Sequence, residues 1–256
     1  MVRSLVLFSG GIGSWAAARR LVDDGEEVDL LFTDTRIEDE DVYRFISDAA
    51  KDLGVPLHRL ADGRTPWELF NDEKLIGNTR ADLCSRVLKR ELSRKWIDER
   101  WPDGTTVAMG IDWSEAHRFE RARPRWEPHT LIAPLTQPPY MSKLEMIAWA
   151  QGRGLDPPRT YAMGFAHANC GGFCVKQGQG AFITLLEQIP ERYAEHEKAE
   201  EAFRVNVGKD VAILRDRRGG TTLPFTLRQL RERYETQPEQ LDLLDMGGCG
   251  CMVDDG

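Results

Sequence analysis

The chain has 256 residues, of which 41% are hydrophobic and 30% charged; this composition suits a folded α/β protein and excludes a disordered one. Its formal net charge of −8 argues against a generic grip on a nucleic-acid backbone, although a local basic channel is compatible with it. Residues 1–11 lack the apolar core and cleavage site of a signal peptide, and no stretch approaches the roughly 18 apolar residues of a membrane span. We therefore expect a cytoplasmic protein without membrane contact.

The first sixty residues alternate short apolar runs with helical patterns. Strands are predicted at residues 4–8, 28–32 and 55–60, with helices at residues 13–24 and 40–53 between them. Gly25 and Gly54 follow the two helices, where glycine suits the left-handed position. This order predicts an α/β fold with a doubly wound, mostly parallel sheet, whose ligands bind beyond the carboxyl ends of the strands.

The rest of the chain continues the pattern and then changes. We predict helices at residues 82–99, 142–151, 180–193 and 227–234, a strand at residues 105–111, a basic loop at residues 118–128, and a hairpin from residues 211–214 and 221–225. Ser142 and Glu145 have the spacing of a capping box. We expect a nucleotide-binding catalytic domain over residues 1–200 and a small C-terminal α/β appendage over residues 201–256.

A glycine-rich turn closes the first predicted strand. It reads Ser9, Gly10, Gly11, Ile12, Gly13 and Ser14 and is called the phosphate loop below. Glycines let a backbone approach an anion, and free N–H groups at the following helix N-terminus favour negative charge. The spacing matches neither the dinucleotide fingerprint nor the Walker loop, which argues against those two classes of nucleotide site.

At this loop the sequence resembles the PP-loop (adenine nucleotide α-hydrolase-like) superfamily, whose pattern is SGGxDS, and more closely its phosphoadenosine phosphosulfate (PAPS) reductase-like branch. The resemblance extends over most of the first 180 residues. It implies an enzyme that binds ATP or another adenine nucleotide through Ser9, Gly10, Gly11, Ile12, Gly13, Ser14, Thr33, Asp34, Thr35, Gly110, Glu115 and Arg118. Gly13 replaces the aspartate of the family pattern. A requirement for magnesium, and the choice between ATP and another adenylate, are therefore left open.

Five cysteines form the second signal. In related reductases that carry a 4Fe-4S cluster, cysteines lie before a lysine-bearing helix and again late in the domain. The resemblance thus implies Cys84, Cys170 and Cys174 as metal ligands, with Cys249, Cys251 or an open position as the fourth, and it places Lys89 on that helix. Thiolates suit iron–sulfur clusters and zinc alike. Zinc, or no metal at all, stays an alternative.

The chain ends in a Gly-Cys-Gly-Cys segment that contains Cys249 and Cys251. Family reductases carry a nucleophilic cysteine at a comparable place, so these two, Cys84 and Lys89 are our candidate catalytic residues. The activating neighbours of the family tail are absent here. The segment is therefore interpreted in four ways: thiolate delivery, metal ligation, a local disulfide, or no role.

Arginines cluster on both sides of the presumed site, and Arg80 and Arg86 are our candidates for anion binding because guanidinium groups bind phosphate and sulfate in two-pronged fashion. The first functional hypothesis is ATP-dependent adenylation of a nucleobase or other acceptor, followed by sulfur transfer. Its partners are a nucleic-acid or small-molecule acceptor and a sulfur donor.

Three alternatives stay open at this point. One is sulfonucleotide reduction, in which a cysteine attacks an adenylyl sulfate, sulfite is released and a thiol reductant restores the enzyme. The second is an ATP-binding subunit of a DNA-modification or defence complex, and the third is a noncatalytic nucleotide-binding module. A homo-oligomer is compatible with all of them.

Overall fold

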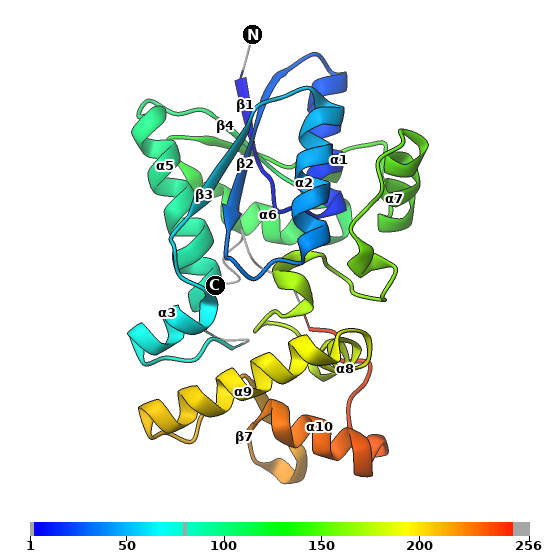
Figure 1. Cartoon of the computed structure of the whole chain (residues 1–256). Coiled ribbons are helices and arrows are strands. Elements are labelled where there is room, and N and C mark those ends of the chain that lie inside the picture. The colour runs from blue at the N-terminus through cyan, green and yellow to red at the C-terminus, as the bar shows by residue number, and fades with distance from the viewer. Residues whose placement is uncertain (1–2, 79–80, 248–256) are drawn as a thin grey trace.

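In the part of the chain that a computed structural model describes, residues 3–78 and 81–247, five strands form one parallel sheet in the order β3-β2-β1-β4-β5 (Figure 1). The strands are β1 (Arg3–Leu7), β2 (Glu27–Asp34), β3 (Leu57–Ala61), β4 (Thr106–Met109) and β5 (Thr130–Ile132). Register is in phase across the centre, with Val6 opposite Leu30 and Ala108. The predicted doubly wound α/β sheet is confirmed.

Both faces of the sheet are buried because successive side chains of a strand point to opposite faces. Val6 and Phe8 belong to a core with α1 (Ile12–Asp23), α2 (Glu40–Leu53) and α7 (Lys143–Gly152). Leu5 and Leu7 belong to a second core with α5 (Leu92–Arg100), whose Ile97 is fully buried. In Figure 1, α1, α2 and α7 lie on one side of the sheet and α5 on the other.

A layer of helices lies against the end of the sheet where β2 and β3 finish (Figure 1). It contains α3 (Pro66–Glu73), α8 (Gln179–Gln188), α9 (Pro190–Val207), α10 (Leu227–Thr236) and the antiparallel pair β6 (Leu214–Asp216) and β7 (Leu223–Phe225). Phe70, Phe182, Phe203 and Phe225 form its core. The predicted hairpin is present. The domain boundary after residue 200 stays a prediction, and α9 runs through that position.

The remaining elements are short and connect these layers. They are α4 (Leu83–Ser85), η1 (Arg86–Glu91), η2 (Trp113–Glu115), α6 (Ala116–Ala122), η3 (Arg123–Trp126), η4 (Pro134–Thr136), η5 (Arg159–Tyr161), η6 (Asn169–Gly172), η7 (Arg218–Gly220) and η8 (Pro238–Gln240). The capping box predicted for Ser142 and Glu145 is present at the start of α7. No helix among the described residues is long and apolar enough to cross a membrane.

Three local predictions are wrong. The basic loop predicted at residues 118–128 is helical from α6 into η3, because Ala122 and Trp126 are one helical turn apart and both are buried. The helix predicted at residues 180–193 is two helices, since Pro190 disfavours helical backbone at the residue before it and starts α9. The helix predicted at residues 82–99 contains a π-helical segment, η1.

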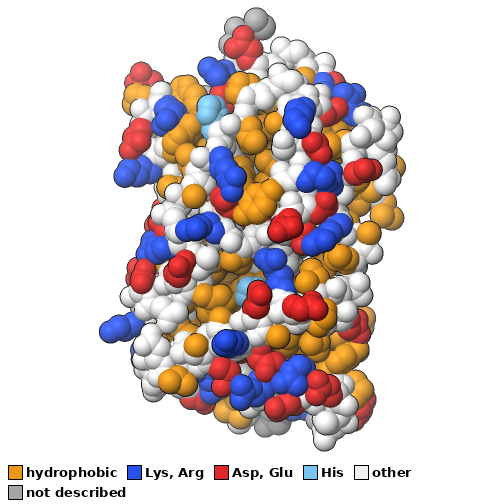
Figure 2. All heavy atoms as spheres, viewed as in Figure 1, with side chains coloured by type: hydrophobic (Ala, Val, Ile, Leu, Met, Phe, Trp, Pro, Cys, Tyr) orange, Lys and Arg blue, Asp and Glu red, His pale blue; other side chains and the backbone are white. Residues whose placement is uncertain are grey.

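Charge is spread over the face shown in Figure 2, where basic and acidic side chains are interspersed from the sheet to the C-terminal helices. Many of them are paired, for example Arg231 with Glu197 at 2.8 Å and Arg233 with Asp216 at 2.9 Å, both from α10. A generic polyanion-binding surface is therefore not seen on this face.

Candidate active site

A pocket lies at the point where the strand order of the sheet reverses. The chain builds β1, β2 and β3 outward in one direction and then returns to place β4 on the other side of β1. Ligands of open α/β sheets bind at the carboxyl ends of strands at such a reversal. A pocket of about 870 Å³, including its open mouth, lies there between the ends of β1 and β4. We call it the switch-point pocket.

The phosphate loop forms the floor of this pocket. Gly10 has a left-handed φ of 79°, and a Cβ there would lie 2.8 Å from Val42, so only glycine fits the turn. Gly11 is the N-cap residue of α1 and has no side chain of its own to cap this N-terminus. The Ser14 hydroxyl donates to the Gly11 carbonyl at 2.8 Å. The first turn of α1 therefore faces the pocket with backbone N–H groups and two serines, as an anion site requires.

Two glycines let α1 and β4 approach each other very closely. A Cβ on Gly13 would lie 2.8 Å from the carbonyl oxygen of Gly110, and a Cβ on Gly110 would lie 2.5 Å from the amide nitrogen of Ser14. Such contacts are shorter than real Cβ atoms show. The replacement of the family aspartate by Gly13 thus has a local steric explanation, because this backbone leaves no room for any side chain there.

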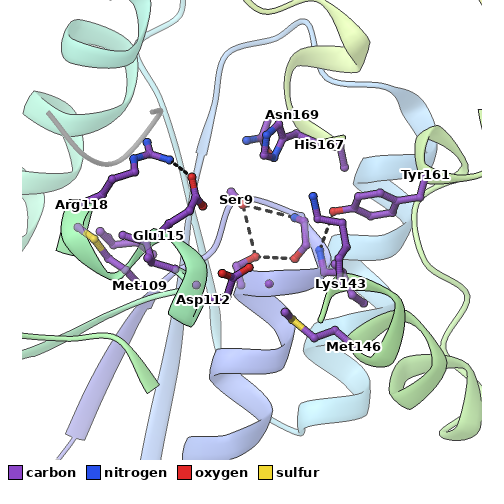
Figure 3. A pocket seen from close by; sticks show the side chains of 18 residues that line it. Ser9, Met109, Asp112, Glu115, Arg118, Lys143, Met146, Tyr161, His167 and Asn169 are labelled. Carbon is purple, nitrogen blue, oxygen red and sulfur yellow. Dashed lines mark hydrogen bonds and ion pairs between the residues drawn. The ribbon is translucent and has the colours of Figure 1, made fainter. Parts of the chain in front are cut away.

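The walls of the pocket carry opposite charges (Figure 3). On one side Arg118 donates to the carboxylate of Glu115, and Asp112 lies near the floor. On the other side are Lys143 of α7 and Tyr161, with His167 and Asn169 above the phosphate loop. The Tyr161 hydroxyl accepts a hydrogen bond from the backbone N–H of Ile12 at 3.0 Å. The pocket therefore combines fixed cations, carboxylates and helix N–H groups.

Most of the predicted nucleotide-binding residues meet in this pocket. The lining includes Ser9, Gly11, Ile12, Gly13, Ser14, Gly110, Glu115 and Arg118. Gly10 supports the loop from behind, against Val42 and Ile46. Residues that the sequence did not mark for nucleotide binding also line it: Met109, Asp112, Lys143, Met146, Tyr161, His167 and Asn169.

The three residues at the end of β2 are directed elsewhere. Thr33, Asp34 and Thr35 are buried and lie outside the lining of the switch-point pocket. Burial opposes ionisation of Asp34, but hydrogen bonds from Arg59 and Tyr43 outweigh it and hold the pKa of this carboxyl below its usual value. The predicted adenosine contact of these residues stays a prediction, and their visible role is to join β2 to β3 and α2.

A second, smaller cavity brings three cysteines together. Cys84, Cys170 and Cys174 line one cavity with Thr35 and Lys89. We call it the thiol cavity. Cys84 and Lys89 come from the helical segment after residue 82, whereas the other two come from the turn around η6. The sequence prediction that these distant cysteines share one place is supported by this arrangement.

A buried ion pair lies beside Cys170. The ammonium of Lys89 is 3.8 Å from its sulfur and 3.6 Å from the carboxylate of Glu38, and both charged side chains are at most 5% exposed. Glu38 also accepts hydrogen bonds from the backbone N–H of Cys170 and from Thr35. A neighbouring cation stabilises a thiolate over a thiol, so the Lys89 ammonium favours a reactive sulfur at Cys170.

Unusual backbone geometry places these groups. Lys89 lies in η1, and π-helical turns are frequent at functional sites. Cys170 has a left-handed φ of 55°, which is uncommon for a residue with a side chain. The next residue, Gly171, is packed so closely against Arg192 that a Cβ would lie 2.3 Å from its guanidinium. Arg192 in turn donates to the carbonyl of Ile37 and so fixes the turn beside Glu38.

The predicted metal ligands were compared with this geometry. Three thiols around one cavity supply the donor chemistry of an iron–sulfur cluster. Among residues 3–78 and 81–247, however, no three His, Cys, Asp or Glu side chains form a group that could hold a metal ion. The Lys89 ammonium also lies against Cys170. The described residues therefore do not form a cluster or zinc site by themselves.

The remaining predicted residues lie apart from the pocket or outside the described chain. Arg86 is 3.7 Å from Glu91 and lines a separate groove with Arg90, Arg94 and Arg125, so an anion-binding role in the switch-point pocket is not supported. Arg80, Cys249 and Cys251 lie outside the described residues.

Known proteins resemble this chain over most of its length. Residues 3–162 match the phosphoadenosine phosphosulfate reductase domain. An uncharacterized protein of Methanocaldococcus jannaschii is 26% identical over 214 residues, which cover 80% of this chain and 43% of that protein. The chain thus spans less than half the length of this relative.

Three solved structures are similar at low identity. A PAPS reductase from Candida auris in a phosphate complex has 16% identity and a TM-score of 0.46, covering 64% of this chain and 79% of that one. An NMN synthetase from Francisella tularensis has 14% identity and a TM-score of 0.41, and the similarity covers 59% of this chain and 61% of that one. A predicted subunit of tRNA methyltransferase from Methanocaldococcus jannaschii has 18% identity and a TM-score of 0.37, and the similarity covers 63% of this chain and 92% of that one. Similarities of this size carry no conclusion about the reaction.

Proposed function

Because the chain belongs to the phosphoadenosine phosphosulfate reductase domain family, we propose that it is an enzyme that binds an adenine nucleotide in the switch-point pocket and acts at its α-phosphate in sulfur chemistry. The phosphate loop binds the phosphates through the N–H groups of α1 and the hydroxyls of Ser9 and Ser14. Lys143 and Arg118 balance the remaining negative charge from the two walls.

The observation that carries this proposal is the path of one segment. His167 and Asn169 line the switch-point pocket, and Cys170 and Cys174, which follow directly, line the thiol cavity. The segment therefore borders both places, so that a sulfur atom at Cys170 belongs to the same structural unit as the nucleotide. A nucleotide site without sulfur chemistry would not need a buried ammonium beside that thiol.

The reaction that we favour has two steps. An oxygen of the acceptor attacks the α-phosphorus of ATP, the bond to the β-phosphate breaks, and pyrophosphate leaves. A hydrosulfide ion supplied by a donor then attacks the adenylated carbon; the new C–S bond forms as the C–O bond breaks, AMP leaves and the proton on sulfur passes to solvent. The Lys89 ammonium, 3.8 Å from the Cys170 sulfur, favours the thiolate of Cys170 over its thiol.

Sulfonucleotide reduction is the second candidate, and the grouping of three cysteines around one cavity favours it. A thiolate attacks the sulfur of an adenylyl sulfate, the S–O bond breaks, and the adenosine phosphate leaves. A second cysteine then attacks the first, sulfite departs, and the resulting disulfide is restored by an external dithiol. In this case Cys170 is the attacking thiolate and Cys84 or Cys174 resolves the intermediate.

Product analysis separates the two. The purified protein is incubated with ATP, sulfide and unfractionated RNA or DNA as the acceptor, or with PAPS plus dithiothreitol, and pyrophosphate, AMP and sulfite are quantified. Pyrophosphate from ATP supports adenylation, and sulfite from PAPS supports reduction; C170S should abolish sulfite release but leave nucleotide binding intact. If the protein binds neither nucleotide in calorimetry, the proposed function is wrong.

The 4Fe-4S cluster and the magnesium dependence stay predictions. Cys84, Cys170 and Cys174 with Cys249 would be the cluster ligands, and the last of these lies outside the described residues. Iron and acid-labile sulfide counted in anaerobically purified wild type and C174A decide the matter: roughly four of each per chain, lost in the variant, support a cluster, and iron-free wild type excludes it.

A further inference from the structure

Two large aromatic side chains are exposed in the chain segments that lead to residues lining the switch-point pocket. Trp113 is 51% exposed and Tyr140 is 57% exposed, and their ring centroids are 6.0 Å apart. We call this pair the aromatic rim. Exposed aromatic surface of this size is costly in water, and such rings are frequent in binding surfaces that cover them.

The aromatic rim joins the two walls of the pocket. Trp113 begins η2, and its neighbours Asp112 and Glu115 line the pocket on one side. Tyr140 comes just before α7, whose Lys143 lines the pocket on the other. A planar group resting on the rim would therefore lie at the mouth of the pocket, next to whatever the phosphate loop binds.

A row of arginines leads away from the same place. Arg118, Arg121 and Arg125 follow one another at helical spacing along α6 and η3, and we call them the arginine row. Arg118 lines the switch-point pocket, whereas Arg125 lines the separate groove that also contains Arg90 and Arg94. Between residues 116 and 126 four arginines stand against one glutamate, a local charge of +3 in a chain of −8.

The spacing of the arginines in the row indicates how many negative charges a bound anion carries. Arg121, in the middle of the row, and Arg125, at its far end, are both exposed. Seven residues separate the ends of the row, about 10 Å along a helix. A ligand that touches the aromatic rim as well as Arg121 and Arg125 therefore needs a planar face and more than one negative charge.

We propose that the aromatic rim and the arginine row form the acceptor site, and that the acceptor is a single-stranded nucleic acid. One unpaired base stacks on Trp113 and Tyr140 at the mouth of the pocket, and Arg121 and Arg125 bind backbone phosphates. An aromatic face can stack only on a base whose own face is free, so a continuous duplex is excluded at the rim. This inference rests on the proposed function, because it names the acceptor for the adenylation step.

Direct binding tests it without any turnover. Fluorescein-labelled single-stranded RNA and DNA of about 12 nucleotides, a length within the range of known single-strand sites, are titrated with the full chain at low and higher salt, and anisotropy is read. Binding of either nucleic acid supports the proposal, and the stronger of the two identifies the source of the acceptor. Failure of both to bind at micromolar protein overturns it.

Two double variants locate the site. W113A/Y140A should weaken oligonucleotide binding by roughly 5- to 150-fold, the range for the loss of one stacked base. R121A/R125A should reduce the slope of log affinity against log salt by about 1.4, as expected when two phosphate contacts of a single strand are lost. The matched control K198A/K209A removes two exposed lysines of the C-terminal layer and should leave both values unchanged.

Each outcome has a defined meaning. If W113A/Y140A binds oligonucleotide like wild type, or loses affinity for ATP instead, the rim is not the acceptor site and the proposal is overturned. Melting temperatures equal to wild type show that a lost affinity is not lost folding. If ATP binds but no oligonucleotide does, only the acceptor is wrong, whereas absence of ATP binding refutes the proposed function itself.

Discussion

Replacement of Gly110 by alanine should displace the phosphate loop, because the added methyl group meets the backbone at the start of α1. The added Cβ would lie 2.5 Å from the amide nitrogen of Ser14 and 2.6 Å from the carbonyl carbon of Gly13, whereas ordinary contact begins at 3.4 Å. The end of β4 and the start of α1 must therefore separate by about 0.9 Å. Both partners are backbone in a packed core, so no side chain can turn away to absorb the strain.

The cost has two parts. Overpacking of this kind destabilises by about 1–3 kcal/mol, which a urea unfolding curve resolves. A shift of this size at a positioning element can lower activity by roughly 100-fold, so we expect a large loss of nucleotide affinity in calorimetry as well.

A matched glycine-to-alanine substitution at another position separates the steric clash from the general effect of replacing a glycine. Gly152 is the last residue of α7 and a Cβ there meets nothing within 4 Å, so G152A should keep wild-type stability and affinity. If G110A binds the nucleotide as tightly as G152A does, the close approach of β4 does not position the phosphate loop and the reasoning is refuted.

Three further predictions follow from other contacts. Y161F removes the acceptor of the Ile12 N–H and should weaken nucleotide binding by roughly 2- to 10-fold, the worth of one hydrogen bond; calorimetry showing no change would contradict it. K89M removes the ammonium that pairs with the buried carboxylate of Glu38 and should lower the free energy of unfolding in urea by about 3–5 kcal/mol. The same variant should slow alkylation of Cys170, followed by peptide mass spectrometry, because the ammonium favours the thiolate. An unchanged alkylation rate would contradict this role of the ammonium. Burial raises the pKa of Glu200 from 4.5 to about 7, so between these pH values the folded protein holds a proton there that the unfolded chain has lost. The free energy of unfolding should therefore fall as pH rises from 4.5 to 7, by up to about 3 kcal/mol. E200Q, measured in parallel, should lack this part of the pH dependence.

The first half of the fold follows from local sequence. The helix predicted at residues 40–53 is α2 with the same bounds, because Gly54 takes the left-handed position and an apolar stripe repeats at helical spacing. By contrast α3 was missed, although Thr65, Pro66 and Glu68 form a capping box with proline at the first helical position. Its apolar stripe is short, and its burial depends on α9, which lies far along the chain.

The site was only partly predictable for the same reason. The phosphate loop is local, since its glycines and serines are consecutive. The contact of Tyr161 with Ile12 joins residues 149 positions apart, and the contact of Lys89 with Cys170 joins residues 81 positions apart. Such contacts depend on how segments far apart in the chain pack together, which no periodicity encodes. Asp34 shows the converse: a carboxylate at a strand end can already accept hydrogen bonds from other side chains, here those of Arg59 and Tyr43, instead of contacting a ligand.

The central claim, that an adenine nucleotide binds with its phosphates on the phosphate loop, is tested most directly by a crystal structure with α,β-methylene ATP, whose α–β bridge resists cleavage. We predict phosphate density within hydrogen-bond distance of the Ser9 and Ser14 hydroxyls and of the first N–H groups of α1. Nucleotide bound in another place, such as the groove lined by Arg90 and Arg94, with the phosphate loop bare, would contradict the claim.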